Sequence, residues 1–124
     1  MPRIKIIFPQ LELEAELNQS PCARKIFQAL PLESRVQRWG EEIYFEIPVS
    51  AELESDARAE VEVGELGYWC AGQAFCIFFG PTPASKGKEP RAYEPVNIIG
   101  ELSKVPKEAL KQIPSGEKVR VEKI

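Results

Sequence analysis

The sequence predicts a mostly β fold, in which an antiparallel sheet of eight strands is closed into a barrel and two short helices cap its open ends. Most segments alternate apolar and polar residues with a period of two, as half-buried strands do. Only two short segments have a helical period, one early and one late, and turn residues separate the strands. A β-sandwich is the competing architecture.

The chain begins with a predicted hairpin and a short helix. Residues 4–8 and 11–17 both alternate, with glutamates on one face of the second segment, and Pro9-Gln10 lies between them. Ser20 is a suitable helix N-cap, and the proline after it suits the first helical turn. Apolar residues then follow at positions i, i+3, i+4 and i+7, namely Ala23, Ile26, Phe27 and Leu30. The sequence therefore predicts a hairpin with one solvent-exposed face and a helix with one buried face.

The middle of the chain predicts a second hairpin and a loop. Residues 32–47 are typical of two strands around Trp39-Gly40. Residues 50–60 are polar and lack a clear period, which favours a loop or a loose helical turn. A strand is expected to restart at residues 61–63.

The second half contains the most apolar run of the chain, residues 75–79, which we expect to form a strand buried on both faces. The proline-rich segment 81–95 is too long for a simple turn, and long connections of this kind often have a function. A strand at 96–102, a helix at 107–113 and a last strand at 119–122 complete the predicted fold.

The composition indicates one folded domain, residues 1–124, and excludes some classes of function. Hydrophobic residues make up 44% of the 124 residues and the net charge is −3, so disorder is not expected. Basic residues are scattered among the acids, which argues against nucleic acid as a partner. No apolar run is long enough for a membrane helix and no leader is evident, so we expect a cytoplasmic protein without a membrane partner.

No familiar catalytic motif is present. The chain has no histidine, which excludes serine-histidine and cysteine-histidine mechanisms and removes the commonest zinc ligand. Its three cysteines, Cys22, Cys70 and Cys76, have no CxxC spacing, so we expect free thiols and neither a metal nor a cofactor. Glu41 and Glu42 are neighbours, and neighbours on a strand point to opposite faces, which disfavours a carboxylate pair.

The most unusual feature is a group of aromatic and charged residues in glycine-punctuated segments. Tryptophan and tyrosine offer large contact areas with a polar edge, as binding sites require. The alternative interpretation is that these residues belong to the core or to the rim of the barrel. The group consists of Arg38, Trp39, Glu42, Tyr44, Tyr68 and Trp69.

Four motifs carry a family resemblance: WGEEIYF at 39–45, GELGYW at 64–69, FFGPTP at 78–83 and VNIIG at 96–100. In this order they resemble the small prokaryotic cyclophilin-like proteins, over nearly the whole chain. The resemblance implies a closed eight-stranded cyclophilin-like barrel. Our leading hypothesis is a binding module, without efficient catalysis, that takes a peptide or a small molecule in a groove. The candidate groove residues are Arg38, Trp39, Glu42, Tyr44, Tyr68, Trp69, Phe79 and Thr82.

Two alternatives follow from the same resemblance. Classical cyclophilins isomerise X-Pro bonds with an arginine, and Arg35-Val36 loosely resembles the surroundings of that arginine, but the glutamine-glycine-glycine-aspartate stretch and the pocket histidine of that family are absent. The candidate catalytic residues of a prolyl isomerase would be Arg35 or Arg38, with Arg91 as a further stand-in. Related domains also accompany urea-amidolyase and carboxylase-type enzymes, which implies a protein partner and a role as an interaction or regulatory subunit of a metabolic enzyme.

Overall fold

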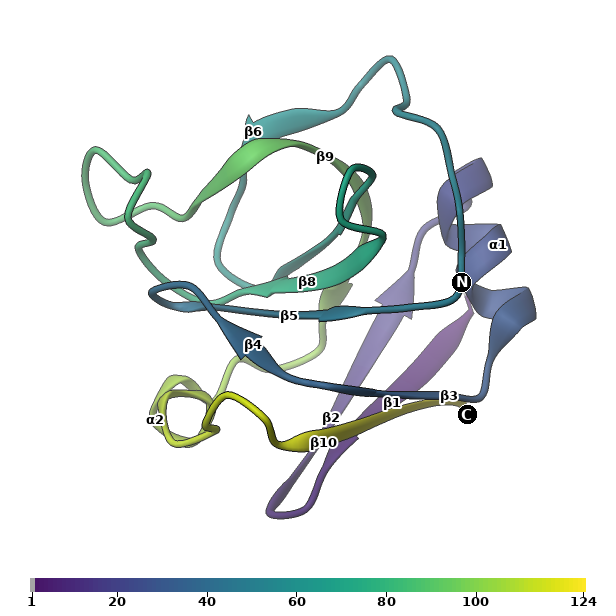
Figure 1. Ribbon diagram of the computed structural model, residues 1–124, viewed down its shortest axis with the longest axis horizontal. Coiled ribbons are helices and arrows are strands. Elements are labelled where there is room, and N and C mark those ends of the chain that lie inside the picture. The colour runs from purple at the N-terminus through teal and green to yellow at the C-terminus, as the bar shows by residue number, and fades with distance from the viewer. Residues whose placement is uncertain (1) are drawn as a thin grey trace.

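The computed structural model describes residues 2–124, which form ten β-strands and two α-helices (Figure 1). The strands are β1 (Arg3–Phe8), β2 (Leu11–Leu17), β3 (Leu32–Arg35), β4 (Gln37–Arg38), β5 (Glu42–Glu46), β6 (Arg58–Glu60), β7 (Glu65–Trp69), β8 (Ala74–Phe78), β9 (Arg91–Leu102) and β10 (Lys118–Lys123). The helices are α1 (Pro21–Ala29) and α2 (Lys107–Lys111). The mostly β character of the fold and its two short helices are confirmed.

Nine strands form one antiparallel path in the order β3-β10-β1-β2-β9-β7-β8-β5-β4, and β6 pairs with β9. The prediction of eight strands is wrong, because the segment 32–47 forms three strands and residues 58–60 add another. No hydrogen-bonded strand pair closes this path within residues 2–124. Its two end strands, β3 and β4, are instead consecutive in the chain and separated by Val36. The Val36 N–H donates to the carbonyl of Glu117, and its own carbonyl accepts from the N–H of Gly116.

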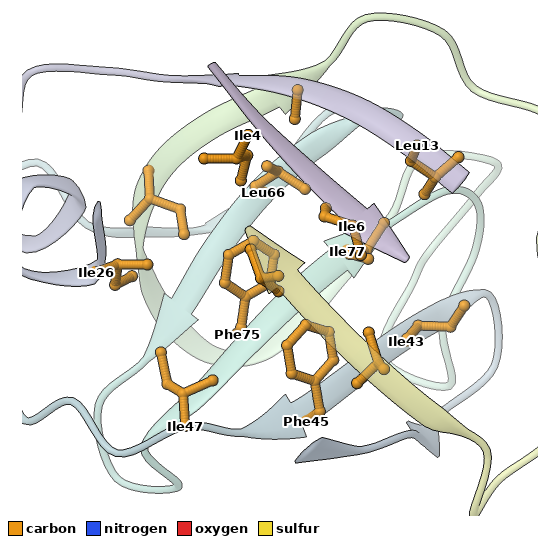
Figure 2. Close-up of a cluster of buried hydrophobic side chains, with 14 of the residues drawn as sticks. Ile4, Ile6, Leu13, Ile26, Ile43, Phe45, Ile47, Leu66, Phe75 and Ile77 are labelled. Carbon is orange, nitrogen blue, oxygen red and sulfur yellow. The ribbon is translucent and has the colours of Figure 1, made fainter. Parts of the chain in front are cut away.

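The main core lies inside the curled sheet, where side chains from strands far apart in the sequence meet (Figure 2). Ile6 of β1, Phe45 of β5 and Phe75 of β8 are fully buried there. The rings of Phe45 and Phe75 stack with their centroids 5.0 Å apart. Each such side chain contributes about 1.5–3 kcal/mol by its burial. This shared core fixes the curvature of the sheet.

A second, smaller apolar cluster covers the outer face of β8. Alternate residues of β8 point to opposite faces, so Cys76 and Phe78 point away from the main core. They pack against Val96, which approaches β7 closely because residue 67 is glycine: a Cβ there would lie 2.9 Å from a Val96 methyl. The other buried members are Val61, Ala74 and Ala92. The prediction of a strand buried on both faces is therefore confirmed for β8, in which every residue is buried.

The helices follow the sequence signals, and they lie on opposite sides of the molecule in the view of Figure 1. The Ser20 hydroxyl accepts a hydrogen bond from the N–H of Ala23 at 3.1 Å, so it caps α1 as expected. Helix α2 ends at Lys111 and is shorter than the predicted 107–113. No helix in residues 2–124 is both long enough and apolar enough to span a membrane.

Two predicted boundaries are wrong near β6 and β9. Residues 61–63 do not start a strand, because the chain turns at Gly64, where φ is +94°, and β7 begins at Glu65. The predicted loop 81–95 ends early, because β9 begins at Arg91. The start of β9 was missed because its first half pairs with β6, and this pairing joins residues that are 31 to 38 positions apart in the sequence.

Candidate functional site

A cavity of about 360 Å³ opens on the outer face of the sheet, next to the second apolar cluster. We call it the aromatic pocket. Its volume lies in the range of roughly 300–1,000 Å³ that is usual for small-molecule sites. The residues that line it are Trp39, Glu42, Tyr44, Trp69, Cys76, Ala92, Tyr93, Glu94 and Val96.

The strand period explains why these side chains converge. On β5, Glu42 and Tyr44 point to the outer face of the sheet. The alternate residues, Ile43 and Phe45, point into the main core. Cys76 lies beside Tyr44 on the next strand, because the two residues are paired in the β5–β8 register. The first half of β9 crosses over this face and forms the opposite wall.

Four aromatic rings form a continuous series around the aromatic pocket. Tyr44 contacts Trp69 with centroids 6.2 Å apart and an interplanar angle of 84°. Trp69 contacts Tyr93 at 6.1 Å and 79°, and Tyr93 contacts Trp39 at 6.0 Å and 88°. All three contacts have the edge-to-face geometry that aromatic pairs favour.

Hydrogen bonds and a turn hold these rings in position. The Trp69 indole Nε1–H donates to Glu94 Oε1 at 2.7 Å, and the Tyr44 hydroxyl donates to Gln37 Oε1 at 3.1 Å. Gly72 lies against the six-membered ring of Trp69, since a Cβ at residue 72 would come within 2.4 Å of that ring. The orientation of Trp69 therefore depends on the β7–β8 turn as well as on its own strand.

Glu42 is the buried charged group of the aromatic pocket. Its side chain is only 6% exposed, and burial raises the pKa of the carboxyl to about 7, an effect that a hydrogen bond with the Cys76 thiol partly offsets. No ion pair within residues 2–124 involves Glu42, and no lysine or arginine lines the pocket in this part of the chain. An ionised Glu42 has no counter-ion in the described protein.

The structure brings together four of the eight candidate groove residues: Trp39, Glu42, Tyr44 and Trp69. Tyr68 belongs to the main core, and its hydroxyl donates to the carbonyl of Val49. Phe79 is fully buried in that core as well. Thr82 is buried, and its hydroxyl donates to the carbonyl of Arg91, which ties the 81–90 segment to β9.

The candidate arginines lie outside the aromatic pocket. Arg38 lies over the ring of Phe79, 5.5 Å from its centroid, and donates to the carbonyls of Ile113 at 2.7 Å and Gly40 at 3.1 Å. Burial lowers the pKa of its guanidinium from the ordinary value, and its Nε atom is buried without a hydrogen-bond partner among the residues that the structure describes. Arg35 donates to the carbonyl of Gly116 at 3.0 Å, and Arg91 forms an ion pair with an exposed glutamate at 3.2 Å.

Several lining residues escaped the sequence analysis: Cys76, Ala92, Tyr93, Glu94 and Val96. Residues 91–96 show no regular alternation of apolar and polar residues, and the prolines around them favoured a loop. No pattern in the sequence marked Cys76 as a pocket residue, because the residues beside it on adjacent strands are set by the strand register. Among residues 2–124, no group of three or more histidine, cysteine, aspartate or glutamate side chains could hold a metal ion.

Comparisons with known proteins agree with this fold. The family model described as Cyclophilin-like matches residues 2–122. The solution structure of the hypothetical protein AF2241 from Archaeoglobus fulgidus is 40% identical, covers 99% of this chain and 95% of its own, and superposes with a TM-score of 0.84. McbB in complex with tryptophan is 15% identical, with a TM-score of 0.68 over 96% of this chain and 44% of McbB, which shows a shared fold. No curated protein matches the chain.

Proposed function

The chain belongs to the cyclophilin-like family, and from this premise we propose that it is a binding protein that takes a small molecule or a short peptide in the aromatic pocket. The observation that carries the proposal is the convergence of four aromatic rings and a buried carboxyl on one cavity. Apolar walls with a few fixed polar groups are what small-ligand sites offer.

The chemistry of the aromatic pocket favours binding over catalysis. The pocket contains no histidine, because the chain has none. Its thiol, Cys76, is fully buried, and burial together with Glu42 raises the pKa of that thiol well above its ordinary value. A thiol of this kind is a poor nucleophile, since the reactive form is the thiolate.

The two tryptophans of the chain, Trp39 and Trp69, both line the pocket, so their indole N–H signals in an NMR spectrum report on this site. We expect a library of small molecules and capped proline-containing peptides to include ligands that shift both indole signals saturably. Such a ligand should bind Trp69→Ala about tenfold more weakly or worse. The melting temperature of this variant should fall only modestly, because Trp69 is half-buried and lies outside the main core.

The matched control is Phe27→Ala, which removes a half-buried ring outside the pocket and should leave the affinity unchanged. Ligands that shift backbone signals elsewhere while both indole signals stay fixed would contradict the proposed site. A large fall in the melting temperature of Trp69→Ala would show that this ring stabilises the fold as a core residue does.

A further inference from the structure

We propose that the ligand of the aromatic pocket carries an organic ammonium group, which the aromatic rings surround and for which the Glu42 carboxylate is the counter-ion. The proposal rests on the proposed function and specifies its ligand class. It follows from the charges that line the pocket, from the orientation of the rings and from the exclusion of other ligands.

The charges around the cavity are of one sign. Glu42 and Glu94 line it, and in residues 2–124 no lysine or arginine does. Glu94 lies at the exposed rim and accepts the indole N–H of Trp69, whereas Glu42 is buried and forms no ion pair within the same residues. Burying a carboxylate without a cation is costly, and a cationic ligand would supply the missing partner.

The four aromatic rings that line the cavity follow one another in edge-to-face contacts. Each neighbouring pair in the series Tyr44, Trp69, Tyr93 and Trp39 is close to perpendicular, with interplanar angles of 84°, 79° and 88°. The polar edges of Tyr44 and Trp69 are engaged in hydrogen bonds. Their faces, which carry the negative end of the ring quadrupole, attract cations within about 6 Å, and tryptophan does so most strongly.

Other ligand classes fit less well. Among residues 2–124, an anion would meet two carboxylates of the pocket lining and no positive side chain there. A neutral apolar molecule would leave Glu42 buried without a partner and would make no use of it. A bare metal ion requires more oxygen ligands than the pocket provides, and no metal-binding group was found in residues 2–124. An ammonium group satisfies both the rings and the carboxylate.

The same group can come from a free amine or from a lysine side chain, and the test separates these sources. We would titrate the protein with choline, with its uncharged isostere 3,3-dimethyl-1-butanol, and with the capped peptide acetyl-Gly-Lys-Gly-amide, and follow the indole signals of Trp39 and Trp69. We expect choline or the peptide to bind at least about tenfold more tightly than the isostere. Choline binding identifies a small molecule, and binding of the peptide alone identifies a lysine side chain.

The decisive variant is Glu42→Gln, which should weaken binding of the ammonium probe about tenfold or more. Its control is Glu46→Gln, which removes an exposed carboxylate from the same strand and should change the affinity less than about twofold. Should Glu42→Gln fail to fold, Tyr93 offers a second variant, because its side chain is 71% exposed. We expect Tyr93→Phe to keep the affinity and Tyr93→Leu, which lacks a ring face, to lose it.

Equal binding of choline and its isostere would overturn the ammonium proposal and leave the aromatic pocket as a binding site. Equal binding by wild type and Glu42→Gln would overturn the role of the carboxylate. If none of the three probes moves the indole signals, the ammonium class is wrong, and the library screen then decides separately whether the pocket binds other ligands.

Discussion

Glu42 places a carboxyl group in a largely buried position, and this has a measurable effect on stability. Burial raises its pKa from an ordinary value of 4.5 to about 7, so the folded state holds this proton more tightly than the unfolded chain does. As the pH rises from about 4.5 to about 7, the unfolded state ionises first and the folded state loses relative stability. Above pH 7 the cost is constant, at about 3 kcal/mol.

We therefore expect Glu42→Gln to gain stability relative to the wild type as the pH rises from 4 to 8, by about 3 kcal/mol in total. Urea unfolding at several pH values measures this difference. Val121→Ala is the control, because it weakens the main core without changing a charge and does not line the aromatic pocket, so it should lower the free energy of unfolding equally at every pH. If the free energy of unfolding had the same pH dependence in the wild type and in Glu42→Gln, the assignment of a raised pKa to this residue would be contradicted.

At the scale of single residues, the sequence analysis identified part of the pocket but grouped its residues with adjacent residues that belong to the core. Tyr68 and Trp69 are adjacent on one strand, so their side chains point to opposite faces, and only Trp69 faces the pocket. The same alternation sends Phe79 into the core. Composition alone does not separate these residues, because tryptophan, tyrosine and phenylalanine suit a core and a binding site equally.

The β7–β8 hairpin carries a prediction about the turn that supports Trp69. Gly72→Ala would place a Cβ within 2.4 Å of the Trp69 ring and must displace that ring. We expect ligand affinity to fall about tenfold and the free energy of unfolding to fall by about 1–3 kcal/mol. The indole signal of Trp69 should move in the ligand-free spectrum.

Gly87→Ala is the matched control for this substitution. Its Cβ would lie 3.3 Å from the flexible end of the Glu89 side chain, in the segment between β8 and β9. We expect neither affinity nor the Trp69 signal to change. A Gly72→Ala protein with an unmoved Trp69 signal and full affinity would show that the turn does not position the ring.

Elements with local signals were predictable, and elements formed by distant pairing were not. The β1–β2 hairpin and α1 agree with the sequence analysis because a turn and a side-chain cap specify them within a few residues. Strand β6 and the first half of β9 depend on each other across the chain, and each alone is polar or rich in proline. Four of the nine residues that line the pocket lie on β9, so this part of the wall could not be derived from local patterns.

For the molecule as a whole, we expect no acceleration of prolyl isomerisation. Arg35 and Arg38 both donate to backbone carbonyls, and neither lines the aromatic pocket. Uncatalysed X-Pro isomerisation takes tens to hundreds of seconds, so a small effect is measurable. The rate for a proline-containing peptide should stay within about twofold of the uncatalysed rate at high protein concentration.

The controls for this assay are Arg35→Ala and Arg38→Ala, each tested after its folding has been verified. Acceleration by the wild type that either variant abolishes would establish an isomerase and identify its arginine. It would also contradict a function limited to binding.

The connection of β3 to β4 through Val36 has a further consequence, for self-association. A long, open sheet edge is a template on which another chain can add a strand, and it promotes aggregation. Here the two ends of the strand path are short, four residues in β3 and two in β4, and they are successive parts of one segment. At the two ends of this path, a neighbouring molecule would therefore find only short stretches of free backbone to pair with.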